Sequence, residues 1–70
     1  METVYLVLAH GGTIEVQYEP DDWDAIDADM TSAWQRQGLW NPSTEGAEAW
    51  LNGQPLSVIN MAHVIATGEV

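Results

Sequence analysis

The chain has 70 residues, of which 11 are acidic, one (Arg36) is basic and none is cysteine, and its net charge is −10. This length fits one acidic domain, which we assign to residues 1–70. The lack of cysteine excludes a disulfide, a thiolate metal site and a cysteine nucleophile. The charge excludes direct binding to a phosphate backbone and disfavours an anionic membrane surface, and it favours a basic protein partner.

The first part of the chain predicts a β-hairpin. "TVYLVLAH" (3–10) is rich in β-branched and aromatic residues, and "TIEVQYE" (13–19) alternates between apolar and polar residues. Gly11 and Gly12 between them suit the positive φ angles of a hairpin turn. In the second strand we expect an inward face of Ile14, Val16 and Tyr18, with Thr13, Glu15 and Gln17 facing out.

The first strand is apolar on both faces. Val4, Leu6 and Leu8 point one way, and Tyr5, Val7 and Ala9 point the other. Such a strand is typical of the centre of a sheet that is covered on both sides. A domain this small buries only a thin core, so we expect a second copy of the chain or a larger partner to supply the missing cover.

A helix is predicted from about residue 21 to 37, ending at Gly38. Its apolar stripe consists of Trp23, Ile26, Met30, Ala33 and Trp34. The segment "EPDDWDAIDADM" (19–30) is half acidic. Asp21, Asp22 and Asp24 suit the helix start, as caps or as charges that complement the helix dipole. Asp27 and Asp29 lie beyond the first turn, so the dipole does not require them.

The second half predicts mainly strands. "LWNPSTEG" (39–46) has the composition of a loop, and the β-prone residues 47–59 surround the hairpin signal Asn52-Gly53. A short helix over 42–51, capped by Asn41, is the competing interpretation. A last strand is expected over 63–67. The predicted fold is therefore α+β, a small antiparallel sheet with one helix on one face, in the order β-β-α-β-β with a fifth short strand.

Patterns that carry catalytic or metal chemistry are weak in this sequence. The spacing of aspartates in "DDWDAIDAD" resembles a calcium loop but lacks its glycine and its final glutamate. Ser57 and His63 have no orienting acid beside them, and His10-Gly11-Gly12 fits a hairpin turn better than an oxyanion loop. We therefore expect no catalytic residue, no metal site and no cofactor.

Candidate residues for a protein-binding surface come from two features. The first is the set of acids on the helix, and the second is the set of aromatic and apolar residues without an assigned place in the core. Trp40, in the predicted loop, fits either a binding patch or a lid folded back onto the core. The predicted partner-binding residues are Asp24, Asp27, Asp29, Trp40, Tyr5 and Val7.

The segments "LVLAHGGTIEV", "DDWDAI" and "WLNGQPLSVINMAHVIA" together resemble small uncharacterised proteins of actinobacterial bacteriophages and their hosts. Those proteins carry a glycine hairpin, an acidic helix and a second hairpin with tryptophan and asparagine-glycine. The resemblance covers most of the chain and implies a fold shape, with no catalytic residues to carry over.

The sequence thus predicts a cytoplasmic, non-enzymatic interaction protein that forms an oligomer and binds or inhibits a host protein. One alternative is a nucleic-acid mimic, in which the acidic helix imitates phosphates for a DNA-binding protein. Another is a structural or assembly subunit. A third explanation of the acidity is solubility alone.

Overall fold

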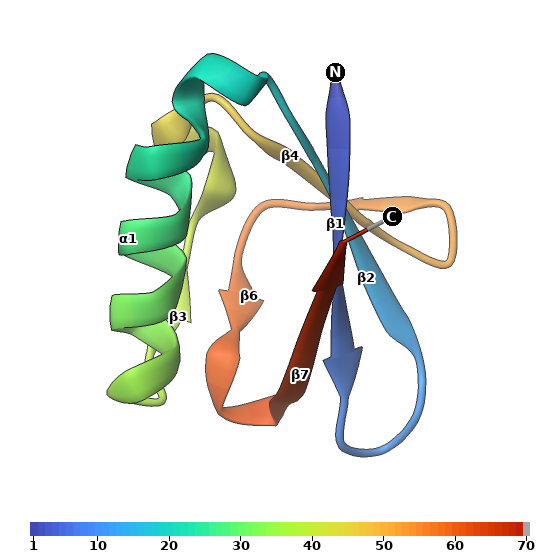
Figure 1. The fold of residues 1–70 in the computed structure, drawn as a ribbon. Coiled ribbons are helices and arrows are strands. Elements are labelled where there is room, and N and C mark those ends of the chain that lie inside the picture. Colours follow the sequence, from blue (N-terminus) through green and yellow to red (C-terminus); the bar gives the residue numbers. More distant parts are fainter. Residues whose placement is uncertain (70) are drawn as a thin grey trace.

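The computed structural model describes residues 1–69 and packs one α-helix against an antiparallel sheet of five strands (Figure 1). The α+β fold predicted from the sequence is confirmed. The helix α1 spans Trp23–Gln35. The sheet order is β5-β4-β2-β1-β7, with strands β1 (Glu2–Leu8), β2 (Thr13–Tyr18), β4 (Glu48–Leu51), β5 (Gln54–Leu56) and β7 (Val64–Glu69).

The predicted first hairpin is confirmed, and its register sets the inner face of the sheet. Val4 pairs with Val16 and Leu6 pairs with Ile14, so the apolar positions of β1 and β2 fall on the same side. The turn uses positive φ angles at Gly11 and Gly12, of 88° and 94°. These angles strain any residue with a Cβ, which explains the pair of glycines.

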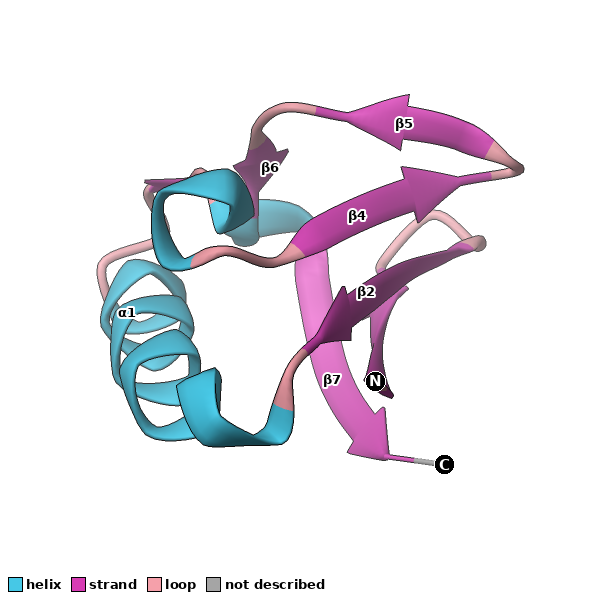
Figure 2. Ribbon diagram, turned by 90° about the horizontal axis from the view of Figure 1, so that it is seen from above, coloured by secondary structure: helices cyan, strands magenta, loops and turns pink. Residues whose placement is uncertain are grey.

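The predicted apolar stripe of the helix packs on that inner face. Ile26, Met30 and Ala33 are buried. The two tryptophans of the stripe lie at its margins, where Trp23 stacks on Tyr18 at 4.7 Å between ring centroids and the Trp34 indole donates a 2.8 Å hydrogen bond to the carbonyl of Val64. Figure 2 shows the helix to one side of the sheet. The core thus lies between α1 and one face of the sheet.

The start of the helix differs from the prediction. Residues Pro20–Asp22 form a 3₁₀ turn, η1, before α1 begins. Asp22 is the residue that precedes α1, yet its side chain makes no capping hydrogen bond. The capping role predicted for the aspartates is therefore wrong for Asp22, and attraction to the helix dipole and solubility remain as explanations of the acids here.

The segment predicted as a loop over 39–46 contains two short elements. Leu39–Trp40 (β3) pairs with Ile59–Asn60 (β6) as a second, two-stranded sheet, and Pro42–Glu45 forms the 3₁₀ turn η2. Proline begins this turn and the Asn41 side chain accepts a 3.1 Å hydrogen bond from the Ser43 amide. The competing helix over 42–51 is thus limited to one turn.

The favoured hairpin is confirmed in the same region. Strands β4 and β5 pair across Asn52 and Gly53, whose φ angles are 54° and 79°. Two consecutive positive angles are the geometry that asparagine-glycine supports best. The chain then passes through β6 and the 3₁₀ turn η3 (Met61–His63) into β7, which lies beside β1 as an edge strand. The predicted last strand is confirmed, although it starts one residue later and ends two residues later than the expected 63–67.

The helix ends at Gln35, two residues before the predicted end at 37, and its left-handed terminating residue is Gln37 in place of Gly38. The Gly38 amide bonds to the Ala33 carbonyl at 2.9 Å and the Gln37 amide bonds to the Trp34 carbonyl at 3.1 Å. This paired arrangement requires a left-handed residue before Gly38, and that residue is Gln37, with φ of 53°. A residue with a side chain therefore occupies the position that glycine favours.

We predict that Gln37→Gly stabilises the fold by about 1 kcal/mol, because glycine removes the strain of the left-handed conformation. Gln35→Gly, inside the helix, is the matched control and should destabilise by about 0.5–1 kcal/mol. Urea denaturation followed by far-UV circular dichroism measures both. A Gln37→Gly variant that loses as much stability as Gln35→Gly would contradict the assignment of the helix end.

Candidate functional site

The face of the sheet turned away from α1 has no second layer within residues 1–69. We call it the outer face and define it by the alternate side chains of β1 and β2 together with one residue of β4. The sequence predicted cover on both sides of β1, but the described part of the chain supplies it on one side only (Figure 2). The outer face consists of Thr3, Tyr5, Val7, Thr13, Glu15, Gln17 and Trp50, and none of these is buried.

The register of three strands sets a line of side chains across this face. Tyr5 on β1 is directly opposite Glu15 on β2, and Glu15 is directly opposite Trp50 on β4. A carboxylate therefore stands between two aromatic residues, at the centre of the sheet. Strand pairing fixes this order because residues opposite each other project to the same side.

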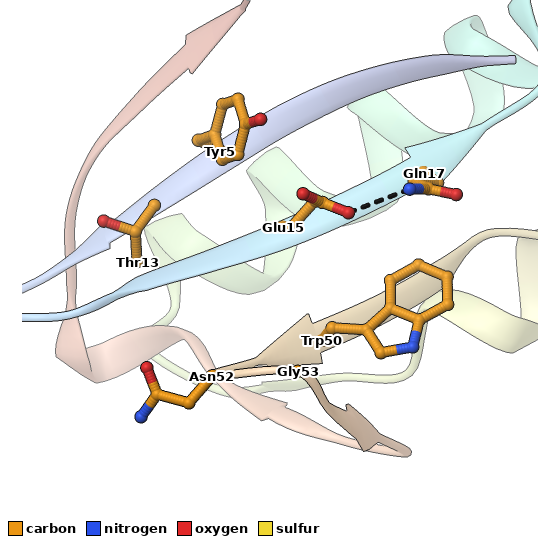
Figure 3. Close-up of a pocket in the computed structure, with 7 residues that line it drawn as sticks. All are labelled: Tyr5, Thr13, Glu15, Gln17, Trp50, Asn52 and Gly53. Carbon is orange, nitrogen blue, oxygen red and sulfur yellow. Dashed lines mark hydrogen bonds between the residues drawn. The ribbon is translucent and has the colours of Figure 1, made fainter.

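A concavity of about 440 Å³ lies over this line, and Figure 3 shows the residues that line it. The Gln17 side-chain amide donates a 2.8 Å hydrogen bond to one carboxylate oxygen of Glu15 (Figure 3). The turn at Asn52 and Gly53 closes one end of the concavity. Its volume lies in the range of ordinary ligand-binding pockets, and its lining mixes aromatic with polar groups.

Trp50 also borders a second hollow at the edge of the sheet. This hollow has a volume of about 260 Å³ and lies along β4 and β5, with Ser43 of η2 also lining it. Its lining is mostly apolar and includes Ala47, Pro55 and Leu56. Trp50 thus stands between two depressions, which makes it the large aromatic side chain best placed for contact with a partner.

The acids predicted to bind a partner lie on a different side of the molecule. Asp24 and Asp27 are exposed and Asp29 is half-buried, all on α1. Because α1 lies to one side of the sheet (Figures 1 and 2) and packs on its inner face, the sheet lies between these acids and the outer-face residues Tyr5 and Val7. The predicted residues therefore form two surfaces, and one flat partner cannot cover both at once.

Trp40 belongs to neither surface. Its side chain is 1% exposed and it packs in the core cluster with Ile26, Ile59 and Met61. Of the two alternatives for Trp40, the lid folded onto the core is the correct one, because pairing of β3 with β6 turns the indole inward. Its indole nitrogen has no hydrogen-bond partner among the described residues.

The residues considered for catalysis do not form a site in the described chain. The ring of His63 lies against the ring of His10, edge to face, with 5.6 Å between centroids. No hydrogen bond joins Ser57 to either histidine within residues 1–69. The part of the chain that the structure describes holds no group of three or more histidine, aspartate or glutamate side chains arranged for a metal ion.

Comparison with known proteins identifies no relative of this chain. No protein-family model, curated protein or solved structure matches the chain. Within the described residues, no helix has the length and apolar character needed to cross a membrane. The resemblance to phage proteins stays a prediction, and the candidate site depends on the geometry of the outer face alone.

We predict that truncation of Trp40 destabilises the fold much more than truncation of Trp50. Trp40→Ala should cost about 3–5 kcal/mol, because it opens a cavity in the core. A domain of this size has a total stability of roughly 4–10 kcal/mol, so the variant should be largely unfolded or close to it. Trp50→Ala should cost about 1 kcal/mol or less, as expected for a side chain outside the core.

Urea denaturation of both variants measures the difference. Losses of equal size would contradict the division into a core tryptophan and a surface tryptophan.

Proposed function

We propose that this chain is a small, non-enzymatic interaction module that binds a basic protein through the outer face of its sheet. The observation that carries the proposal is the line Tyr5–Glu15–Trp50 at the bottom of an open concavity, on a chain with a net charge of −10. Aromatic side chains give much contact area at a low cost in conformational entropy, and they dominate binding energy at interfaces.

The apolar content of the outer face also supports this role. Val7 lies opposite Thr13 at the margin of the concavity and is 37% exposed. Together with Tyr5 and Trp50 it places apolar surface around a polar centre. A partner that covers this face removes that surface from water, at about 25 cal/mol for each Å² of apolar area.

The acidic helix has a separate part in the proposal. Asp24 and Asp27 are exposed on the side away from the outer face, so they contribute to the long-range field instead of direct contact. A field of this kind speeds the approach of a basic partner and weakens as salt increases. The same acids keep the free protein soluble.

Self-association, expected from the sequence, would use the same outer face. A second copy and a basic partner therefore compete for it. Repulsion between copies that each carry a net charge of −10 opposes the homo-oligomer at low ionic strength. We therefore propose that self-association becomes measurable only where salt screens this repulsion.

A comparative pull-down tests the proposed function. Immobilised wild-type protein is incubated with an actinobacterial lysate, the source that the sequence resemblance suggests, beside two double variants. Tyr5→Ser/Trp50→Ser changes the outer face, and Asp24→Asn/Asp27→Asn changes the helix. We predict that the wild type captures a basic protein and that the outer-face variant captures at least tenfold less of it. The helix variant should still capture this protein when binding has reached equilibrium.

Circular dichroism first establishes that both variants are folded. Capture that survives the outer-face changes but fails with the helix changes would contradict the proposal. That result would instead favour the nucleic-acid mimic, because only the mimic needs the helix carboxylates as its contact surface.

A further inference from the structure

We infer that the concavity between Tyr5 and Trp50 is a receptor for one arginine side chain of the partner, with Glu15 as its carboxylate. This inference rests on the proposed function and specifies the chemistry of the group that enters the site. It follows from the spacing of the aromatic residues, the hydrogen bonding of the Glu15 carboxylate and the net charge of the chain.

The spacing suits a flat cation. Tyr5 and Trp50 lie on either side of Glu15, two strand spacings apart, which is about 10 Å. A guanidinium group entering over Glu15 can therefore lie within about 6 Å of an aromatic ring, the distance at which the ring attracts a cation. Figure 3 shows Tyr5, Glu15 and Trp50 on three successive strands around this space.

The carboxylate of Glu15 is oriented and only partly used. Gln17 donates to its Oε2 at 2.8 Å, which holds the side chain over the sheet. An ionised carboxylate has about four acceptor sites on its two oxygens, so Oε1 keeps its acceptor capacity. Paired N–H donors of a guanidinium match a carboxylate in a way that a single ammonium does not. The site therefore favours arginine over lysine.

A second copy of this chain is a poor source of the cation. Arg36 is the one arginine in the sequence, and lysine is absent. Arg36 follows the last turn of α1, on the opposite side of the sheet from the concavity, and its Nη1 donates to the Ser32 hydroxyl at 2.9 Å. A second copy thus brings ten net negative charges, which repel the first copy, whereas a basic partner brings complementary charge.

The test is a titration followed by ¹H–¹⁵N NMR. The probe is a short capped glycine peptide with one central arginine, and the matched peptides carry lysine or citrulline at that position. We expect shifts at the amides of Tyr5, Glu15 and Trp50 and at the Trp50 indole. The lysine peptide should bind several-fold more weakly, and the citrulline peptide, which keeps the shape but loses the charge, should cause no saturable shift.

Two protein variants that each remove one negative charge form the second part of the test. Glu15→Gln removes one negative charge at the site and should lower the affinity for the arginine peptide at least tenfold. Asp27→Asn removes one negative charge from α1 and should change the affinity for this peptide less than twofold. The citrulline comparison uses the wild-type protein, so it remains decisive even where a variant folds poorly.

Three results would overturn the inference. They are equal binding of the arginine and citrulline peptides, an equal loss of affinity in Glu15→Gln and Asp27→Asn, or chemical-shift changes confined to the amides of α1. If the Tyr5/Trp50-dependent capture of a basic protein survives while the arginine peptide fails, only the inference falls. If that capture fails as well, the proposed function falls with it.

Discussion

The constraint on which this structure depends is that one helix has to serve as the cover for a sheet of five strands. Burial of Ile26, Met30 and Ala33 against the inner face gives the domain its core. The chain between the helix and β7 completes that core from the same side, since Trp40, Ile59 and Met61 are buried as well. All of this apolar cover goes to one face, and the outer face keeps its side chains in contact with solvent.

The alternation of β1 explains why the outer face is unusual. In a sheet with one solvated face, outward positions are normally polar, yet β1 presents Tyr5 and Val7 there. Strand β2 presents Thr13, Glu15 and Gln17 beside them, and β4 adds Trp50. The result is an amphipathic surface at the centre of the sheet. In the function proposed for this surface, the negative charge of the chain favours a basic partner over an acidic one.

Much of the fold follows from local sequence patterns. Turn residues and alternation predicted both hairpins, and the helical stripe predicted which side chains of α1 are buried. Asn41 and Pro42 indicated the start of a helix, but a single turn is all that forms before β4, because Ala49 and Leu51 pair with β2. The pairing of β3 with β6 joins residues about twenty positions apart, and nothing in "LW" or "IN" alone indicates it.

The candidate site was only partly predictable for the same reason. Tyr5 and Val7 were identified from β1 alone, and the outward position of Glu15 and Gln17 followed from the alternation of β2. The contribution of Trp50 depends on the pairing of β2 with β4, which a single sequence does not reveal. The prediction of Trp40 as a partner-binding residue was wrong. A tryptophan beside asparagine and proline has the composition of a loop, whereas the pairing of β3 with β6 places it in the core.

Hydroxyl-radical footprinting with mass spectrometry tests the central claim most directly, because it compares the exposure of side chains within one molecule. At low protein concentration and low salt, Tyr5 and Trp50 should be oxidised much faster than Trp40, which is 1% exposed. The account predicts that Tyr5 and Trp50 become protected when the captured basic partner is bound, while the oxidation of Trp40 stays slow. Protection of Tyr5 and Trp50 in the free protein under those conditions, or oxidation of Trp40 as fast as Trp50, would contradict it.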